Sequence, residues 1–258
     1  MKRILFLLLA VCCIVGALAS ALRQRPLNAI ICYHELAVQD EVRRFRIVVP
    51  KRLAKQTPVL LAFHGIGDSP ESMAEYTKLD ELAAQEGFIL VYPEGRLSTW
   101  STFNLNPWQL ENNADVQFFD AILAYLLEHH PVDPTHVYVA GMSNGASFAQ
   151  LLGTIRADKI AAIVAHSGAR PRELAEMKYN VPTLLIVGSN DLATPDMQHD
   201  AEMYQQYETN PRGSNSIQLL QVAGLGHEWA LKHNRDMWTF LIRYRNDDAD
   251  FNELMDPD

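Results

Sequence analysis

The chain has 258 residues, of which 48% are hydrophobic and 21% are charged, a composition ordinary for a globular protein with a substantial core. Its formal net charge of −9 would become −11 without the first 19 residues, which carry two basic and no acidic side chains. This acidity disfavours nucleic-acid binding, because neutralising phosphates requires a basic face.

The amino-terminal segment has the pattern of a signal peptide. Two basic residues precede an apolar stretch, residues 4–19, which ends in the small-x-small pattern Ala17-Leu18-Ala19. The stretch is shorter than the ~20 residues that a membrane-spanning helix needs. We expect a signal peptide over residues 1–19, a secreted or periplasmic protein, and no stable membrane association after cleavage; a retained signal anchor is the alternative. Cys32 is then the only cysteine left, so no intrachain disulfide is expected.

The rest of the chain alternates between strand-like and helix-like segments. Apolar runs predict strands near residues 43–49, 58–63, 88–92, 136–140, 160–166, 182–187 and 216–222. Amphipathic patterns predict helices near residues 70–86, 114–130, 144–154, 196–208 and 230–244. This alternation is typical of an α/β fold with a mostly parallel sheet and helices on both faces. We expect the strand over residues 43–49 to be an antiparallel edge.

No repeat, linker or shift in composition divides this region. We therefore expect one domain over residues 20–246, without a separate carbohydrate- or polymer-binding module. The last segment, residues 247–258, contains six acidic residues and is expected to be a solvated tail.

A serine between two glycines follows the strand predicted near residues 136–140. The segment is Gly141-Met142-Ser143-Asn144-Gly145, and a helical pattern begins directly after it. A strand, a sharp turn with serine at its tip and a helix form the context of a nucleophile elbow. Because a bare G-x-S-x-G recurs by chance, a helix-capping serine is the alternative interpretation.

In the elbow architecture the serine is followed along the chain by an acid and then a histidine. Three histidines come late enough to be the base. His199 and His233 lie in helix-like stretches, whereas His227 lies on a glycine-rich loop after the strand predicted over residues 216–222. We therefore predict His227 as the base; a turn histidine with no catalytic role is the alternative.

The orienting acid is found in the same way. Asp191 follows the strand predicted over residues 182–187, and ligand-binding groups gather at the carboxyl ends of parallel strands. Asp196 follows Pro195 and is expected to cap the next helix instead. A turn-capping role for Asp191 is the alternative.

Acyl transfer also requires backbone N–H groups that stabilise the oxyanion. The strand predicted over residues 58–63 ends in His64-Gly65-Ile66-Gly67-Asp68, where glycines allow the backbone to turn its amides inward. We predict the N–H groups of Ile66 and Asn144 as the oxyanion donors, and His64 as a structural residue of the turn.

Taken together, these segments resemble the α/β-hydrolase superfamily, and more narrowly the secreted polyhydroxybutyrate depolymerases and feruloyl or acetylxylan esterases. The resemblance runs from about Arg43 to Tyr244. The matching segments are residues 44–50, 61–65, 91–95, 115–118, 132–134, 137–145 and 224–229.

Four positions depart from the family. The family often has glycine where this chain has Ala146, proline where it has Ala230, and aspartate where it has Ala114. It also has a paired-cysteine segment where residues 104–113 contain no cysteine. These departures leave the triad residues in place, but they weaken the transfer of the family's substrate to this chain.

The resemblance implies a carboxylic ester hydrolase that works through an acyl-enzyme intermediate, with Ser143, Asp191 and His227 as the triad. Trp229 resembles the family's tryptophan at that position and is expected to contact substrate, whereas core or rim packing is expected for Trp100 and Trp108. The substrate would be a small-molecule or polysaccharide-linked ester, with short-chain, acetyl, aryl or feruloyl acyl groups. No cofactor and no metal site are expected.

Three other functions stay open: a serine peptidase of the prolyl-oligopeptidase type, a polyhydroxyalkanoate depolymerase, and a non-catalytic binding protein with this fold. The connection over residues 167–181 is expected to hold one short crossover and no lid, because a parallel crossover itself needs about a dozen residues.

Overall fold

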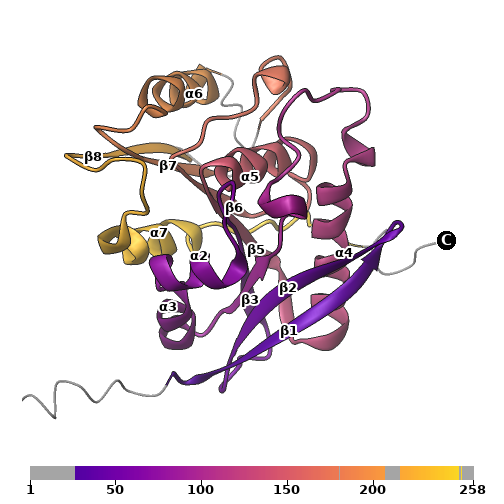
Figure 1. Ribbon diagram of the computed structural model, residues 1–258. Coiled ribbons are helices and arrows are strands. Elements are labelled where there is room, and N and C mark those ends of the chain that lie inside the picture. Colours follow the sequence, from indigo (N-terminus) through magenta and orange to yellow (C-terminus); the bar gives the residue numbers. More distant parts are fainter. Residues whose placement is uncertain (1–26, 180, 207–215, 250, 252–258) are drawn as a thin grey trace, which may run out of the picture.

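The computed structural model describes residues 27–179, 181–206, 216–249 and 251. These residues build an eight-stranded sheet in the order β1-β2-β4-β3-β5-β6-β7-β8 (Figure 1). The strands are β1 (Ala29–Val38), β2 (Glu41–Pro50), β3 (Thr57–Phe63), β4 (Ile89–Pro93), β5 (Val132–Met142), β6 (Ala162–His166), β7 (Thr183–Gly188) and β8 (Ile217–Val222). The six strands from β4 to β8 in this order are parallel, which confirms the predicted mostly parallel sheet.

The strand predicted over residues 43–49 is antiparallel, as expected, but its predicted place at the edge of the sheet is wrong. β2, predicted as the edge, lies between β4 and β1, and it is antiparallel to both. β1 was not predicted at all, although it pairs with β2 along its whole length. A two-residue turn at Gln39 and Asp40 joins the two strands, and Gln39 adopts a positive φ of 54° there. Cys32, the free cysteine among the described residues, lies on β1.

Helices cover both faces of the sheet, as predicted. The helices are α2 (Pro70–Thr77), α3 (Leu79–Glu86), α4 (Ala114–His129), α5 (Asn144–Ile155), α6 (Thr194–Gln206) and α7 (Asn234–Leu241). Apolar side chains of α4, α5 and α6 pack on one face of the sheet. Those of α2, α3 and α7 pack on the other face.

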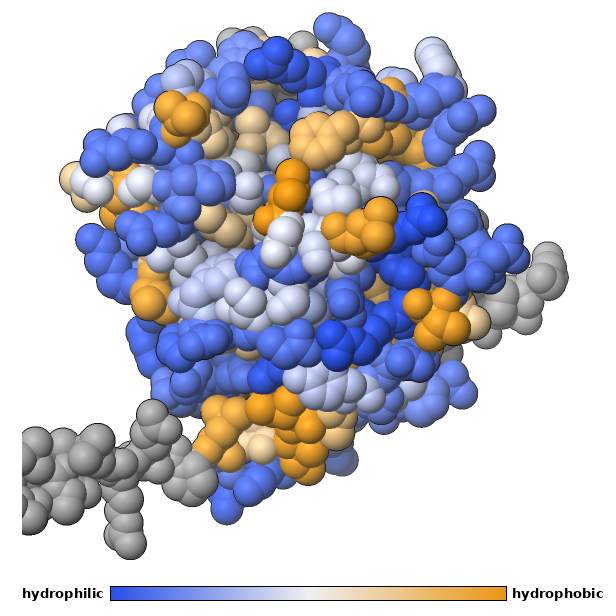
Figure 2. All heavy atoms as spheres, in the orientation of Figure 1, coloured by the Kyte–Doolittle hydropathy of each residue, from blue (hydrophilic) through white to orange (hydrophobic). Residues whose placement is uncertain are grey.

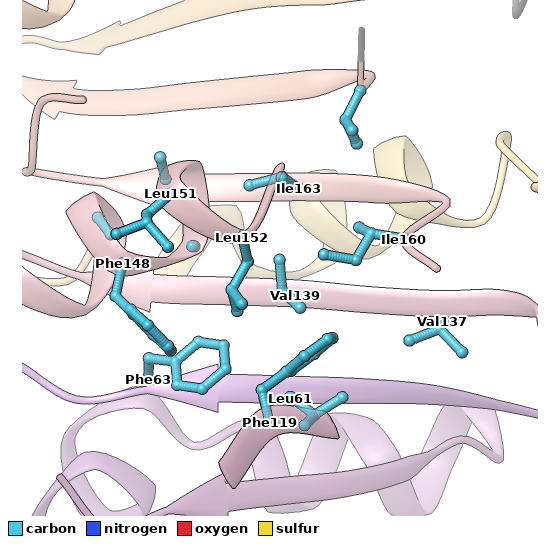
Figure 3. Close-up of a cluster of buried hydrophobic side chains, with 14 of the residues drawn as sticks. Leu61, Phe63, Phe119, Val137, Val139, Phe148, Leu151, Leu152, Ile160 and Ile163 are labelled. Atoms are coloured by element: carbon cyan, nitrogen blue, oxygen red, sulfur yellow. The ribbon is translucent and has the colours of Figure 1, made fainter. Parts of the chain in front are cut away.

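The sheet's central strands are buried on both faces, which explains why their sequences read as continuous apolar runs. Figure 3 shows the core between α5 and the sheet, where Phe148 lies against Phe63. The ring centroids of Phe63 and Phe148 are 5.0 Å apart, and the two rings meet edge to face. This packing fixes α5, whose first turn follows Ser143.

Two predicted helices differ from the structure. The helix predicted over residues 70–86 is broken at Lys78, which has a φ of 54°. The break places Asp80 where its carboxylate accepts hydrogen bonds from Arg46, at 3.0 Å, and from the Tyr92 hydroxyl. The helix predicted over residues 230–244 begins only at Asn234, after a short 3-10 turn.

The role predicted for Asp196 is also wrong. α6 begins at Thr194, so Asp196 lies inside the first turn of the helix and does not precede it. An acidic residue in this turn still favours the helix through the helix dipole.

The predicted signal peptide, residues 1–19, lies outside the described residues, as does most of the predicted acidic tail. Phe251, which belongs to that tail, is nevertheless buried in the core on the α4–α5 face, so the expectation of a solvated tail does not hold there. Within the described ranges, no helix is long and apolar enough to cross a membrane. Figure 2 shows a mainly hydrophilic face on which apolar residues form separate patches.

Candidate active site

The predicted site residues come together at the carboxyl ends of neighbouring parallel strands. Ser143 directly follows β5, Asp191 follows β7 and His227 follows β8. The turn that carries Ile66 follows β3, on the other side of β5. Residues that are up to 161 positions apart in the sequence thus share one edge of the sheet.

Ser143 lies at the tip of a strained turn. Its φ of 56° and ψ of −121° are unusual for a residue with a side chain, and its hydroxyl makes no capping bond to α5. Its backbone N–H donates to the His166 carbonyl at 2.8 Å, which fixes the turn to β6. The serine hydroxyl is therefore held away from its own helix and is available to other partners.

Gly168 packs against the serine turn so closely that no side chain fits. A Cβ on Gly168 would lie 2.0 Å from the carbonyl oxygen of Ser143. We expect Gly168→Ala to displace the turn and to lower the free energy of unfolding by about 1–3 kcal/mol or more, as overpacking does. Gly226→Ala is the matched control, because a Cβ there meets nothing within 4 Å.

Urea denaturation of the two variants measures this difference. Equal stability of Gly168→Ala and the wild-type protein would contradict the close packing of the turn.

Ser143, His227 and Asp191 form a continuous hydrogen-bonded chain. The Ser143 Oγ is 2.9 Å from Nε2 of His227, and Nδ1 of the same ring is 3.1 Å from each carboxylate oxygen of Asp191. About half of the His227 side chain is exposed, whereas that of Asp191 is buried. The ring can therefore exchange protons with an incoming molecule while its acidic partner stays fixed.

The surroundings of Asp191 keep its carboxylate ionised. Burial alone would raise the pKa of this group. The Ala193 backbone N–H, which donates at 2.9 Å, the Ser167 hydroxyl and His227 together outweigh burial and lower the pKa. An ionised carboxylate beside Nδ1 favours the tautomer that leaves Nε2 free to accept the serine proton.

The predicted oxyanion donors lie on either side of Ser143. Asn144 is the first residue of α5, and Ile66 follows Gly65, on which a Cβ would lie 3.5 Å from the Ser143 Cβ. Within the described part of the chain, the backbone N–H groups of Ile66 and Asn144 donate no hydrogen bond. The turn is closed by the Asp68 N–H on the Gly65 carbonyl, with Gly67 at a φ of 77°.

The Asn144 side chain holds this arrangement in place by using all of its hydrogen-bonding capacity. Its Oδ1 accepts from the Trp100 N–H at 2.7 Å and from the Thr99 hydroxyl. Its Nδ2 donates to the Trp100 carbonyl and, at 2.6 Å, to the Thr102 hydroxyl. The residue after the serine is thereby bound to the loop over residues 94–102.

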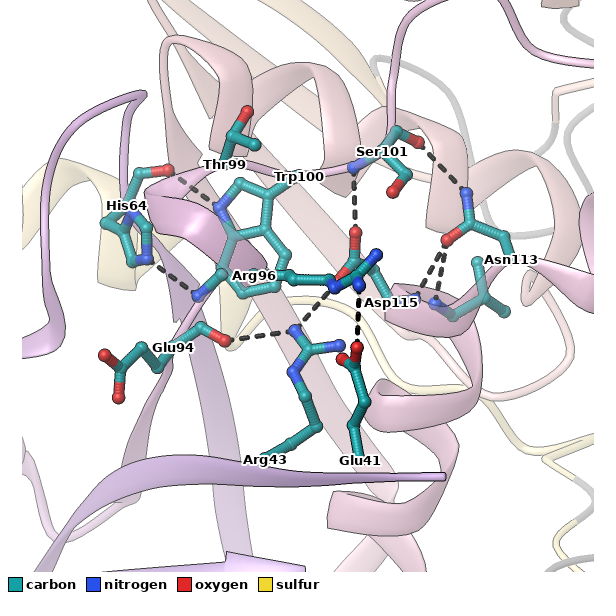
Figure 4. Close-up of polar contacts among 12 residues, drawn as sticks. Glu41, Arg43, His64, Glu94, Arg96, Thr99, Trp100, Ser101, Asn113 and Asp115 are labelled. Carbon is teal, nitrogen blue, oxygen red and sulfur yellow. Dashed lines mark hydrogen bonds and ion pairs between the residues drawn. The ribbon is translucent and has the colours of Figure 1, made fainter. Parts of the chain in front are cut away.

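The 94–102 loop also holds the turn over residues 64–68, here called the oxyanion turn because it carries Ile66, as Figure 4 shows. The Trp100 indole N–H donates to the His64 carbonyl at 2.9 Å, and the Gly95 N–H donates to the His64 Nε2 at the same distance. Since Nε2 accepts, the proton of the ring lies on Nδ1 and is donated to the Gly65 carbonyl at 2.8 Å. Burial lowers the pKa of His64, so the ring is neutral, and its predicted structural role is confirmed.

A buried ion pair between Arg43 and Asp115 anchors the 94–102 loop at Glu94 and Ser101. Asp115, at the start of α4, accepts from the Ser101 N–H and from the Arg43 guanidinium, both at 2.8 Å (Figure 4). Arg43 also donates to the Glu94 carbonyl at 3.0 Å. Losing either charge would leave its partner buried and uncompensated, so the pair specifies the loop conformation.

A cavity of about 550 Å³ opens beside the serine, and it is lined by Gly65, Ile66, Ser143, His227 and Trp229 among other residues. The Trp229 indole N–H is already bound to Asn234, so only the apolar surface of the ring could meet a ligand. Contact of Trp229 with substrate therefore stays a prediction. Trp100 is buried, as expected for core packing, whereas Trp108 is 92% exposed, so the packing expected for Trp108 is wrong.

Several supporting residues escaped the sequence interpretation. These are the Asn144 side chain, Trp100 as a hydrogen-bond donor, the Arg43–Asp115 pair, and the His166–Ser167 pair next to Asp191. Asp115 lies in a segment that carried the family resemblance, which was the one available signal. Among the described residues, no cluster of three or more His, Cys, Asp or Glu could hold a metal ion.

Residues 45–180, more than half of the chain, match the model of a family described as esterase PHB depolymerase. This region includes Ser143, the oxyanion turn and the 94–102 loop. Asp191 and His227 lie beyond it.

Curated relatives point the same way. The chain is 31% identical over 180 residues to a putative esterase of Nocardia uniformis, covering 67% of this chain and 52% of that protein. It is 29% identical over 170 residues to a bifunctional acetylxylan esterase/xylanase of Neocallimastix patriciarum, covering 66% of this chain and 23% of that protein. The chain thus spans about half, or less, of the length of these relatives.

Solved structures share the fold at low sequence identity. The acetyl xylan esterase from Aspergillus awamori superposes with a TM-score of 0.65 at 14% identity, covering 81% of this chain and 98% of that one. A fluorophosphonate-binding serine hydrolase of Staphylococcus aureus gives 0.65 at 11% identity, covering 83% and 98%. The sheet order and these neighbours confirm the predicted α/β-hydrolase fold. Since the family model spans the strands and turns that build the serine side of this site, the chain belongs to the esterase PHB depolymerase family.

Proposed function

We propose that this protein is a serine esterase that hydrolyses carboxylic esters through an acyl-enzyme intermediate. The observation that carries the proposal is the continuous hydrogen-bonded chain from the Ser143 hydroxyl through His227 to the buried Asp191 carboxylate. The relatives and structural neighbours named as esterases support the same reaction class.

In the first step His227 accepts the Ser143 proton at Nε2 while the serine oxygen attacks the ester carbonyl. The backbone N–H groups of Ile66 and Asn144 donate to the oxyanion. One such donor typically lowers the activation barrier by about 3 kcal/mol. His227 then protonates the leaving alcohol. In the second step it activates a water molecule, which hydrolyses the acyl-serine.

Two measurements test this proposal. A fluorophosphonate probe should label the wild-type protein and fail to label Ser143→Ala, which separates an enzyme from a binding protein. A panel of matched ester and amide substrates then separates an esterase from a serine peptidase. Faster turnover of peptides than of esters would overturn the esterase assignment in favour of the peptidase.

The rate of acylation should depend on one proton. Protonated His227 cannot accept the serine proton, so kcat/KM should rise with pH from the acid to the neutral range. Asp191 stays ionised throughout because its pKa is lowered, and His166, whose pKa burial lowers to about 3, stays neutral. The logarithm of kcat/KM should therefore fall with a slope of one below the midpoint.

A profile of kcat/KM from pH 4 to 9 on nitrophenyl acetate gives this slope. A flat profile, or a slope of two, would show that His227 is not the single titrating base.

We further propose substrates with short or aryl acyl groups. The cavity beside Ser143 has about 550 Å³, and Ile66 at its rim is 62% exposed. In the connection between β6 and β7, the described residues form one 3-10 turn, η3 (Arg172–Leu174), and no helix that could act as a lid. A long acyl chain would therefore lie largely in water.

Nitrophenyl butyrate should have a kcat/KM at least as high as that of the palmitate ester, because the added methylene groups gain no burial. Measurements below and above the micellar concentration should show no jump in rate. Preferential hydrolysis of palmitate with such a jump would mean that a covering element exists. Turbidity of a polyhydroxyalkanoate suspension tests the depolymerase alternative directly.

We also propose that the protein is exported. The signal-peptide pattern of residues 1–19 supports export, and the amino-terminal sequence of the mature protein recovered from outside the cytoplasm tests it.

A further inference from the structure

A buried histidine lies directly behind the proposed triad and takes no part in the mechanism above. His166 is the last residue of β6, is 1% exposed, and accepts the Ser143 backbone N–H through its carbonyl. Its ring stacks on that of Trp229, with 4.9 Å between the ring centroids. Its two ring nitrogens nevertheless both make polar contacts.

Those contacts fix the direction of the hydrogen bonds. Nε2 is 2.8 Å from the backbone nitrogen of Ala230, whose N–H can only donate, so Nε2 accepts. Nδ1 therefore carries the ring proton and donates it to the Ser167 Oγ at 3.1 Å. Burial is the main reason that the pKa of His166 is low; His227 and His233 lower it further, while Asp191 acts in the opposite direction. The ring is thus a neutral donor at neutral pH.

Ser167 continues this direction toward Asp191. Because its oxygen accepts from His166, its own hydroxyl proton is available to the Asp191 carboxylate, whose pKa the Ser167 hydroxyl helps to lower. Ser167 is 1% exposed, and its backbone N–H is held by the Ile186 carbonyl at 2.8 Å. Its φ of 57° is unfavourable for a residue with a Cβ, so the position of this hydroxyl is maintained against backbone strain.

These contacts lie on two sides of the base. His166 bonds the Ala230 N–H and the Ser167 hydroxyl, and Asp191 bonds His227, which lies three residues before Ala230 in the chain. We propose that His166 and Ser167 are positioning residues, which orient the Asp191 carboxylate and anchor the loop that carries His227. This inference rests on the proposed esterase function.

The position of Ser167 has a chemical consequence as well as a geometric one. Ser167 and the Ala193 N–H each share the negative charge of the Asp191 carboxylate, which reduces its pull on the His227 proton. Removing the Ser167 hydroxyl should strengthen that pull, because the carboxylate then has fewer donors. Protonated His227 would be favoured, and the acid limb of the pH–rate profile would move to higher pH.

Ser167→Gly tests this idea without straining the backbone, because glycine tolerates a φ of 57°. We expect kcat/KM to fall about 10- to 100-fold, the value of a hydrogen bond to a charged group, mainly through kcat. We also expect the midpoint of the acid limb to rise by about half a pH unit or more.

Gln39→Gly is the matched control. It also places glycine at a positive φ, 54°, and removes a side-chain hydrogen bond, but it lies in the turn between β1 and β2 and not at the serine site. We expect it to leave kcat/KM and the profile unchanged. In a second variant, His166→Phe, the stacked ring is kept but the donor to Ser167 and the acceptor for Ala230 are lost, and the midpoint should again rise.

A Ser167→Gly enzyme with wild-type kcat/KM and midpoint would overturn the inference. So would a fall in kcat/KM at an unchanged midpoint, because a purely structural role of Ser167 predicts that result.

A failure of the inference can be told apart from a failure of the proposed function. If the function fails, wild-type protein and Ser143→Ala hydrolyse esters equally. If only the inference fails, Ser143→Ala is inactive while Ser167→Gly behaves as the wild-type protein does.

Discussion

Replacing Ser143 with alanine should lower kcat for nitrophenyl acetate by about 10⁴-fold or more, because no other group can form the acyl intermediate. The fold should survive, since the Ser143 hydroxyl makes no capping bond to α5 and its only described partner is His227. Stopped assays and thermal unfolding of the purified variant measure both effects.

Ser147→Ala is the matched control for this variant. Ser147 lies one helical turn further along α5 and is not among the residues that line the cavity beside Ser143, so its loss should cost little activity. Undiminished turnover by folded Ser143→Ala would remove the nucleophile assignment.

Replacing Asp191 with asparagine should lower kcat by about 10⁴-fold, a loss as large as that known for the equivalent change in serine proteases. An amide cannot balance the charge of protonated His227, and its N–H group favours the wrong tautomer of the ring. The oxygen that remains can still accept the Ala193 N–H, so the loop should stay folded.

Asp196→Asn separates the two neighbouring acids. Asp196 is largely exposed, and its nearest ion-pair partner is Arg172 at 3.8 Å, so its loss should change kcat by less than about twofold. If the two effects were reversed, Asp196 would be the orienting acid.

The chain order of strand, serine turn, acid and histidine was enough to select Ser143, Asp191 and His227 from the sequence. Strand ends are readable because buried parallel strands are apolar runs that stop abruptly at polar loops. All three selected residues follow such runs, and the structure brings their side chains together. Their catalytic roles stay predictions until the variants are measured.

β1 could not be read in the same way. It is an edge strand with one face in solvent, so its inward residues, such as Cys32 and Leu36, alternate with exposed ones such as Tyr33. The turn at Gln39 and Asp40 also lacks the glycine that usually marks a tight hairpin.

The break at Lys78 and the network around Asn144 were unpredictable for a different reason. Each depends on partners distant in sequence: Arg46 for Asp80 after the helix break, and Trp100 for the Asn144 side chain. Local propensity carries no information about such pairs, because burial and hydrogen bonding only arise once the sheet is assembled.

The two buried neutral histidines make the folding equilibrium depend on protons. His64 and His166 have lowered pKa values in the folded state, whereas in the unfolded chain each would titrate near 6.5. Their contribution to stability is complete above that value and is lost progressively as the pH falls toward the folded pKa, which for His166 is about 3. For His166 alone the full loss is on the order of 5 kcal/mol, comparable to the net stability of a typical domain. The same rings that hold the oxyanion turn and the Asp191 carboxylate therefore set a lower limit on the acidity in which the protein can stay folded.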